Sequence, residues 1–142
     1  MTRCVLDSSV ALAWLLPGEA TNATEALLDE IAADSAAAPG LWPLEIANVL
    51  LQAQKAQRVT ANEVRRSLAT LAGLPIHIDS DTAAQAWGRS LSLAEAHGLT
   101  LYDASYLELA LRLHVPLATL DKKLRQAAAK CGVRRLGQQE AP

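Results

Sequence analysis

The chain has 142 residues, of which 51% are hydrophobic and 20% charged, with a formal net charge of −2. This length predicts a single domain, residues 1–142, with a hydrophobic core of its own, and the composition is typical of a compact soluble protein. The net charge gives none of the overall basic field expected of a general nucleic-acid binder. Two cysteines, at positions 4 and 131, match neither a zinc site nor a disulfide framework.

Nothing in the sequence predicts a membrane-spanning or exported protein. No apolar run approaches the ~20 residues that a transmembrane helix needs. The run from Val10 to Leu16 is short, Asp7 lies in the approach to it, and no small-residue cleavage site follows closely. We therefore expect a cytoplasmic location and no membrane partner.

Short apolar runs alternate with longer segments of helical periodicity along the chain. Strands are expected around residue 5 and over 36–39, 76–78, 115–120 and 133–136. Helices are expected over 8–16, 21–34, 43–57, 60–73, 80–97, 101–113 and 121–130, and a disordered tail over 137–142. Pro43, the "TANE" capping box beginning at Thr60, and Gly98 mark helix ends in this pattern. Strands separated by helices predict an α/β fold, with a parallel sheet covered on both faces.

Four carboxylates sit where ordinary surface residues are not expected. Asp7 and Asp121 each follow an apolar strand, and Glu45 lies in the first turn of an almost wholly apolar helix. Ligands of open parallel sheets bind at the carboxyl ends of the strands, so we expect these three acids at one edge. Asp103 opens another helix and is harder to place, because the element before it is also a helix.

Four converging acids would repel one another strongly unless a cation were bound. Carboxylates without His or Cys suit hard ions, so the pattern predicts Mg²⁺ or Mn²⁺. Asp7 and Asp103 are our first choice as direct metal ligands. Glu45 and Asp121 would complete the site directly or through water, or help to deprotonate the nucleophile. Such a site can activate water and stabilise a phosphodiester during hydrolysis.

Each acid has a simpler explanation when it is considered alone. An Asp after a strand is often only a helix cap, which applies to Asp7 and Asp121. Glu45 and Asp103 could be first-turn acids that the helix dipole favours, and Thr100 with Asp103 resembles a capping box. The site hypothesis depends on all four acids occurring at matching places in one α/β order.

Four motifs in this order resemble the PIN domain and, within it, the VapC-type toxin ribonucleases of bacterial toxin–antitoxin pairs. The motifs are "VLDSSV", "LWPLEIANVL", "LTLYDASYLELAL" and "LATLDKKL". The third is the most specific, and the resemblance covers nearly the whole chain. It implies a PIN-like three-layer α/β/α fold with a short central parallel sheet.

The resemblance also implies a function and partners. It predicts a magnesium-dependent endoribonuclease that acts on RNA, forms a homodimer and is blocked by a cognate antitoxin protein. Asp7, Glu45, Asp103 and Asp121 would be its catalytic acids. Ser9 and Thr119 match polar positions that orient a water molecule or a carboxylate. A catalytically silent PIN-like binding module is the alternative, and a receiver-type signalling domain is a weaker one.

The basic residues are unevenly distributed. Of the 15 acidic residues four are site candidates, so 11 remain against 13 basic residues. A run without acids begins beside Asp121, and Lys122, Lys123 and Arg125 within it could hold an RNA backbone. The alternatives are a solvated helix face or a surface that faces the antitoxin.

Aromatic and apolar side chains complete the sequence-based predictions. Trp87 and Tyr106 are assigned to the core, as is Tyr102, although either tyrosine could instead stack on a base. The segments "VALAWLL" and "LWPLEIANVLL" carry more apolar residues than one helix face needs. They predict a partner surface near the first helices.

Overall fold

The computed structural model describes residues 1–138, and these contain a five-stranded sheet. The strands are β1 (Val5–Leu6), β2 (Ala36–Ala38), β3 (Ile76–Ile78), β4 (Leu117–Ala118) and β5 (Arg135–Leu136). They lie in the order β3-β2-β1-β4-β5, and all neighbouring pairs are parallel. The predicted α/β fold with a short parallel sheet is confirmed.

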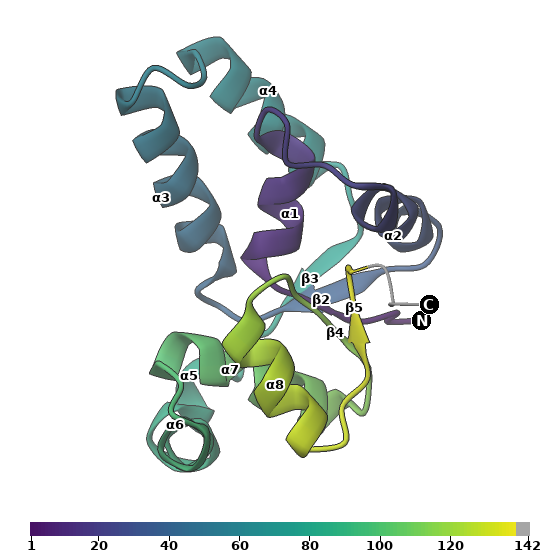
Figure 1. The fold of residues 1–142 in the computed structure, drawn as a ribbon, viewed down its shortest axis with the longest axis vertical. Helices are drawn as coiled ribbons and strands as arrows, with labels where there is room; N and C mark the ends of the chain where they lie inside the picture. The colour runs from purple at the N-terminus through teal and green to yellow at the C-terminus, as the bar shows by residue number, and fades with distance from the viewer. Residues whose placement is uncertain (139–142) are drawn as a thin grey trace.

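Helices cover the sheet on both faces (Figure 1). The first face carries α1 (Ser8–Leu15), α2 (Asn22–Ala33), α3 (Trp42–Lys55) and α4 (Ala61–Ala72). The second carries α5 (Thr82–Gln85), a π-helical turn (Ala86–Ser90), α6 (Leu91–His97), α7 (Leu101–Leu113) and α8 (Lys122–Lys130). The result is three layers, α/β/α, with the hairpin of α3 and α4 projecting away from the sheet.

The chain reverses its direction of travel across the sheet at β1. It first moves outward from β1 through β2 to β3, then returns to β4 on the other side of β1 and ends on β5. Because parallel crossovers are right-handed, this reversal sends the connections before and after it to opposite faces. The carboxyl ends of β1 and β4 therefore flank the position where open α/β sheets bind ligands.

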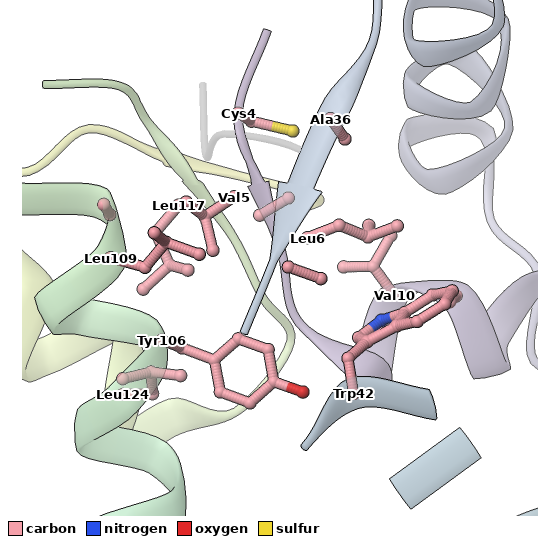
Figure 2. Packing of buried hydrophobic residues seen from close by; sticks show 14 of the residues in the cluster. Cys4, Val5, Leu6, Val10, Ala36, Trp42, Tyr106, Leu109, Leu117 and Leu124 are labelled. Atoms are coloured by element: carbon pink, nitrogen blue, oxygen red, sulfur yellow. The ribbon is translucent and has the colours of Figure 1, made fainter. Parts of the chain in front are cut away.

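The core joins α7 to the middle of the sheet. Val5, Leu6 and Leu117 of the central strands are fully buried, as are Tyr106 and Leu109 of α7 (Figure 2). Each such side chain contributes about 1.5–3 kcal/mol by leaving water. This packing holds the first turns of α7, which carry Asp103, close to the ends of β1 and β4. Tyr106 is in the core, as predicted.

Side-chain caps begin several of the helices. Thr21, Thr60, Thr100 and Asp121 each accept a hydrogen bond from the backbone N–H three residues further on. The starts predicted at Thr60 and Thr100 are thus confirmed as caps. Gly98 ends α6 in the left-handed conformation, with a φ of 63°, which glycine adopts without a steric penalty.

The helix predicted over 80–97 is present as an uninterrupted helical segment over residues 82–97. The prediction missed the π-helical turn Ala86–Ser90 between α5 and α6, which has Gly88, a poor helix former, at its centre. Trp87 lies in this turn and is 92% exposed, so its assignment to the core is wrong. The fourth strand is shorter than the predicted 115–120 and covers only Leu117–Ala118.

The C-terminal tail predicted over 137–142 falls only partly in the described region. Gly137 is buried with a φ of +104°, and a Cβ there would lie 3.1 Å from a methyl group of Val10. Residues 139–142 lie outside the described residues. Up to Gln138, the structure has no helix whose length and apolar content would let it cross a membrane.

Candidate active site

Asp7 lies at the carboxyl end of β1, where the topology reverses. It occupies the position before α1, yet its side chain makes no capping hydrogen bond to that helix. The residue is only 5% exposed. Its Oδ2 accepts hydrogen bonds from the hydroxyls of Ser9 and Thr119, both at 2.7 Å. A buried carboxylate that is oriented but does not cap is unusual, so the capping explanation does not account for Asp7.

The same two hydroxyls connect the β1 and β4 ends of the site. Ser9 Oγ accepts the N–H of Leu120 at 2.9 Å, and Thr119 Oγ1 accepts the N–H of Asp121 at 3.0 Å. The loops that follow β1 and β4 are therefore held together across the topological reversal. The structure brings Ser9 and Thr119 into direct contact with Asp7.

Glu45 lies in the first turn of α3, half-buried. The hydroxyl of Tyr106, which is fully buried in α7, donates a short hydrogen bond to its Oε1. Figure 2 shows Tyr106 projecting from α7 toward the start of α3, where Trp42 lies. This contact links the two helices that carry Glu45 and Asp103. Sequence reasoning missed it, because the two residues are far apart in the chain.

Asp103 and Asp121 are both at helix starts, with different roles. Thr100 caps α7 by accepting the backbone N–H of Asp103 at 3.1 Å, so the Asp103 carboxylate is not the capping group. Asp121 is exposed, and its Oδ1 accepts the N–H of Leu124 at 2.8 Å, which makes it the cap of α8. Capping occupies one oxygen of Asp121 and leaves the other available.

Burial and mutual repulsion raise the pKa of three of these acids. The pKa of Asp7 is raised mainly by burial and further by the charge of Asp121, against the lowering effect of Ser9 and Thr119. Burial also raises the pKa of Asp103, with added repulsion from Asp121 and Asp7. The four carboxylates are thus close enough to interact electrostatically.

The pKa of Glu45 is raised by burial and then by the charges of Asp7 and Asp103, while the Tyr106 hydroxyl lowers it. Burial and the nearby charge of Asp7 raise the pKa of Tyr106 above its usual range. Tyr106 therefore stays protonated and remains a hydrogen-bond donor. Among residues 1–138, no lysine or arginine forms an ion pair with any of the four acids.

The four acids do not form a ready-made metal centre in this structure. Within the described residues, no three His, Cys, Asp or Glu side chains lie close enough together to hold an ion. The donor set nevertheless consists of carboxylates without a compensating cation, and such oxygen ligands suit Mg²⁺ or Mn²⁺. The chemistry of the residues present therefore fits a hard divalent ion.

Basic residues extend from the site along α8. Lys122 and Lys123 are exposed, and a surface cavity of about 460 Å³ is lined by Lys122, Arg125 and Arg135, among others. Arg125 donates from one guanidinium nitrogen to the carbonyls of Thr119 and Leu136, at 2.7 and 3.0 Å. Arg125 thus supports the loop after β4, a role that its sequence position did not reveal.

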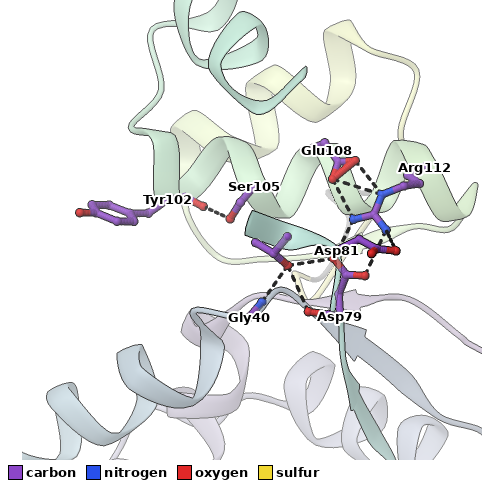
Figure 3. A network of polar contacts seen from close by, with 8 residues as sticks. Gly40, Asp79, Asp81, Tyr102, Ser105, Glu108 and Arg112 are labelled. Carbon is purple, nitrogen blue, oxygen red and sulfur yellow. Dashed lines mark hydrogen bonds and ion pairs between the residues drawn. The ribbon is translucent and has the colours of Figure 1, made fainter. Parts of the chain in front are cut away.

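A second group of acids at the same sheet edge is charge-compensated. Arg112 of α7 binds Asp79, which follows β3, and Glu108 one helical turn earlier, with N–O distances of 2.7–3.2 Å (Figure 3). Glu108 is only 1% exposed. The hydrogen bonds from Arg112 hold the pKa of Asp79 below its usual value. Only the four-residue spacing of Glu108 and Arg112 could have indicated this network from sequence.

Comparisons with known proteins agree with this architecture. A model of the PIN domain family matches residues 4–130. A solved structure from Pyrobaculum aerophilum is 23% identical with a TM-score of 0.69, covering 94% of this chain and 83% of that chain. A structure described as a toxin–antitoxin complex from Klebsiella pneumoniae is 19% identical with a TM-score of 0.57, covering 84% and 88%.

VapBC2 from Rickettsia felis, solved with a DNA fragment from its promoter, is 12% identical with a TM-score of 0.65, covering 94% of this chain and 97% of that chain. No curated protein sequence gives a significant match. The family model covers most of the sequence and includes all four motifs. The chain therefore belongs to the PIN domain family.

Proposed function

We propose that this chain is a metal-dependent endoribonuclease and the toxin of a type II toxin–antitoxin pair. The observation that carries the proposal is the group of four acids without a cation at the topological reversal of the sheet. PIN domains are generally nucleases and typically use divalent metal ions. One of the similar structures is described as a toxin–antitoxin complex, which favours the toxin role.

Each acid has a role consistent with its contacts. Asp7 and Asp103 are the proposed ligands of Mg²⁺ or Mn²⁺, with Asp121 completing the site directly or through water and Glu45 through a coordinated water. When bound, the ion would lower the pKa of a coordinated water and offset charge on the phosphate. Ser9 and Thr119 fix Asp7 through Oδ2. Oδ1 accepts only a long hydrogen bond of 3.5 Å, from the hydroxyl of Ser8, and is the oxygen proposed to bind the ion.

Glu45 is the proposed proton acceptor for the attacking water. Tyr106 occupies its Oε1, so Oε2 is available to receive the proton. A raised pKa brings a carboxylate closer to the range in which a general base works well, and burial with neighbouring acids raises that of Glu45. The reaction class is hydrolysis of an RNA phosphodiester without a covalent enzyme intermediate.

Lys122, Lys123 and Arg125 are the proposed contacts to the RNA backbone. The two lysines are exposed on the first turn of α8, directly after Asp121. Arg125 contributes to the same basic surface, and its hydrogen bonds to the β4 loop give it a second, structural role. The RNA substrate is consistent with the proposed cytoplasmic location.

Exposed apolar residues on α3 support the proposed homodimer and antitoxin contacts. Leu44, Val49 and Leu51 are exposed on this helix, as the sequence of "LWPLEIANVLL" predicts, whereas the residues of "VALAWLL" are buried or partly buried. Exposed apolar side chains gathered on one element mark interaction surfaces. A monomer by light scattering at tens of micromolar, roughly where weak interfaces dissociate, would contradict the dimer.

The test expresses the chain with and without its neighbouring open reading frame. The proposal predicts growth arrest that the neighbour relieves, and RNA cleavage in vitro that magnesium supports and exhaustive chelation abolishes. Mapping the cut sites on total RNA defines the substrate. Cleavage that persists in chelator would exclude the metal mechanism. A folded protein that cuts no RNA in magnesium would favour the silent binding module.

A further inference from the structure

A small pocket lies beside the four acids, and none of the proposed catalytic residues lines it. Its volume is about 350 Å³, at the lower end of the roughly 300–1,000 Å³ of small-molecule sites. Its walls come from the turn before α3, from α5 with the π-helical turn, and from the first turns of α7. Most of the lining is apolar, and it includes Leu41, Ala83, Ala86 and Leu101. We call this the α7 pocket.

One polar side chain in the lining lacks a partner. Ser90 is 1% exposed, and its Oγ has no hydrogen-bond partner among the described residues. The other hydroxyls are satisfied: Thr82 donates to the Asp79 carboxylate and Ser105 to the carbonyl of Tyr102, at 2.8 and 2.6 Å. Buried hydroxyls are normally paired. The Ser90 Oγ exposes less than 1 Å², so a ligand with a hydrogen-bonding edge would pair with it once the Ser90 side chain rotates toward the pocket.

An exposed aromatic ring stands at the rim of the α7 pocket. Tyr102 is 65% exposed, and in Figure 3 its ring projects outward from α7, away from the Arg112 network. The prediction that Tyr102 packs in the core is therefore wrong, and the alternative of base stacking becomes relevant. Exposed aromatic rings are the stacking surfaces of single-stranded RNA-binding sites.

Helical spacing places the α7 pocket next to the acids. Tyr102 and Ser105, three residues apart, line the pocket, since residues at this spacing share a helix face. Asp103 and Tyr106 have the same spacing on the adjacent face, where Tyr106 binds Glu45. An RNA phosphate held at the acids would thus have its neighbouring nucleotide beside the pocket.

We propose that the α7 pocket binds one unstacked nucleobase of single-stranded RNA, next to the phosphodiester that is cleaved. This inference rests on the proposed ribonuclease function and adds a specificity site to it. The base would stack on Tyr102 and direct a polar edge toward Ser90. A planar apolar ring with a polar edge suits this lining, whereas a phosphate needs cations, and no lysine or arginine lines the pocket.

The experiment combines RNA that lacks one base with a protein variant that lacks the Tyr102 ring. RNA cleavage by the full chain is first mapped in magnesium on a single-stranded oligonucleotide. A series of the same oligonucleotide then carries one abasic ribose at each position around the cut. Removing the bound base should lower cleavage efficiency roughly 5- to 150-fold, as expected for one lost stacking contact.

Tyr102→Ala should lower cleavage of the intact RNA by a similar factor and add little further loss on the RNA that lacks that base. Tyr102→Phe should retain the activity, because it keeps the ring. Trp87→Ala is the matched control, since Trp87 is an exposed aromatic side chain outside the pocket lining. Thermal melting checks that each variant remains folded.

The outcomes separate this inference from the function on which it rests. If the wild type cuts no RNA, both are overturned. Two results would overturn the pocket proposal alone, provided that the wild type cuts RNA. One is full activity of Tyr102→Ala. The other is that the loss of cleavage efficiency in Tyr102→Ala has the same factor on every abasic RNA as on the intact RNA. Loss of dimerisation or of antitoxin binding in Tyr102→Ala, with cleavage unchanged, would assign the pocket to a protein interface and also overturn it.

Discussion

Helix α7 contacts two groups of acids that differ in one respect. Near its start, Asp103 lies with Asp7, Glu45 and Asp121, and no described cation pairs with them. Further along, Glu108 lies with Asp79, and Arg112 binds both. The pKa of Asp103 is raised by burial and neighbouring acids, whereas the pKa of Asp79 is lowered by Arg112.

The difference shows that position alone does not identify a site. Asp7, Asp79 and Asp121 all follow strands of the same parallel sheet, yet their surroundings differ. The Arg112 group is complete within the chain and has the properties of a structural ion network. The Asp103 group has no positively charged partner among the described residues, and this difference is the basis for proposing that it binds a cation from solution.

The largest expected effect is on cleavage. Asp7→Asn or Asp103→Asn should lower RNA cleavage about 100-fold or more, because each removes a carboxylate that supports metal-assisted stabilisation worth several kcal/mol. Asp79→Asn is the matched control from the compensated group and should remain active. Cleavage rates under single-turnover conditions decide this. An equal loss of RNA cleavage rate in Asp79→Asn and Asp103→Asn would show that the two groups of acids do not differ in function.

The next effect is on folding. Arg112→Met should lower the free energy of unfolding by about 3–5 kcal/mol, because it leaves Glu108 buried without its partner. Adding Glu108→Leu should restore part of the loss, since Glu108 is then no longer a buried charge, while Asp79, whose side chain is 12% exposed, remains without its partner. Urea denaturation measures both variants. If Arg112→Met alone is as stable as the wild type, Arg112 does not compensate a buried charge.

Much of the fold could be predicted because local signals and topology rules agree. Capping residues such as Thr60 and Thr100, and alternating strands and helices, are local patterns that tertiary packing did not override. The π-helical turn at 86–90 and the exposure of Tyr102 and Trp87 were missed, because these features depend on how the second helical layer packs. Apolar character predicts burial only on average.

The candidate acids could be found because all four occur beside apolar runs in one topological order. Their supporting contacts were less visible. The hydrogen bond from Tyr106 to Glu45 joins residues 61 positions apart. Because the apolar ring of Tyr106 is enough to explain a core position, the sequence did not point to a role for its hydroxyl. The structural role of Arg125 depends on its hydrogen bonds to the backbone carbonyls of Thr119 and Leu136. Every residue has such a carbonyl, so the sequence does not indicate which ones Arg125 binds.

A smaller effect is a pH dependence of opposite sign in the two groups. In chelator at neutral pH, Asp103→Asn should be more stable than the wild type by less than about 1 kcal/mol, because solvent screens half-buried charges. A raised pKa means that the folded protein binds the proton more tightly than the unfolded chain does. Above the raised pKa of Asp103, the wild type therefore pays the full cost of the ionised carboxylate in its free energy of unfolding. Below about pH 3.9, the pKa in the unfolded chain, this cost disappears.

Asp79→Asn should instead be less stable than the wild type at neutral pH. The lowered pKa of Asp79 contributes stability above about pH 3.9 that is lost as the pH falls through the lower folded pKa. Thermal melting of both variants from neutral pH to about pH 2, below the unfolded pKa of both carboxyls, tests the two signs together. Asp103→Asn that is destabilised at neutral pH, and still cleaves RNA, would identify Asp103 as a simple helix-start acid.

The smallest expected effect is on the salt dependence of RNA binding. Lys122→Gln with Lys123→Gln should lower the slope of log affinity against log salt by about 0.7 per lost phosphate contact on a single strand. Arg125 is left intact, because its replacement would also disturb the loop after β4. Fluorescence anisotropy at several salt concentrations measures the slope. An unchanged slope would assign both lysines to a solvated helix face.

Calorimetric titration of Mg²⁺ and Mn²⁺ into the wild type, Asp103→Asn and Asp79→Asn measures whether the acids around Asp103 bind a cation. We expect the wild type and Asp79→Asn to bind with similar affinity. Asp103→Asn should bind at least about tenfold more weakly, which corresponds to a loss of about 1.4 kcal/mol or more of binding free energy. A wild type that binds neither ion, or an Asp103→Asn variant that binds as tightly as the wild type, would contradict the assignment of the site.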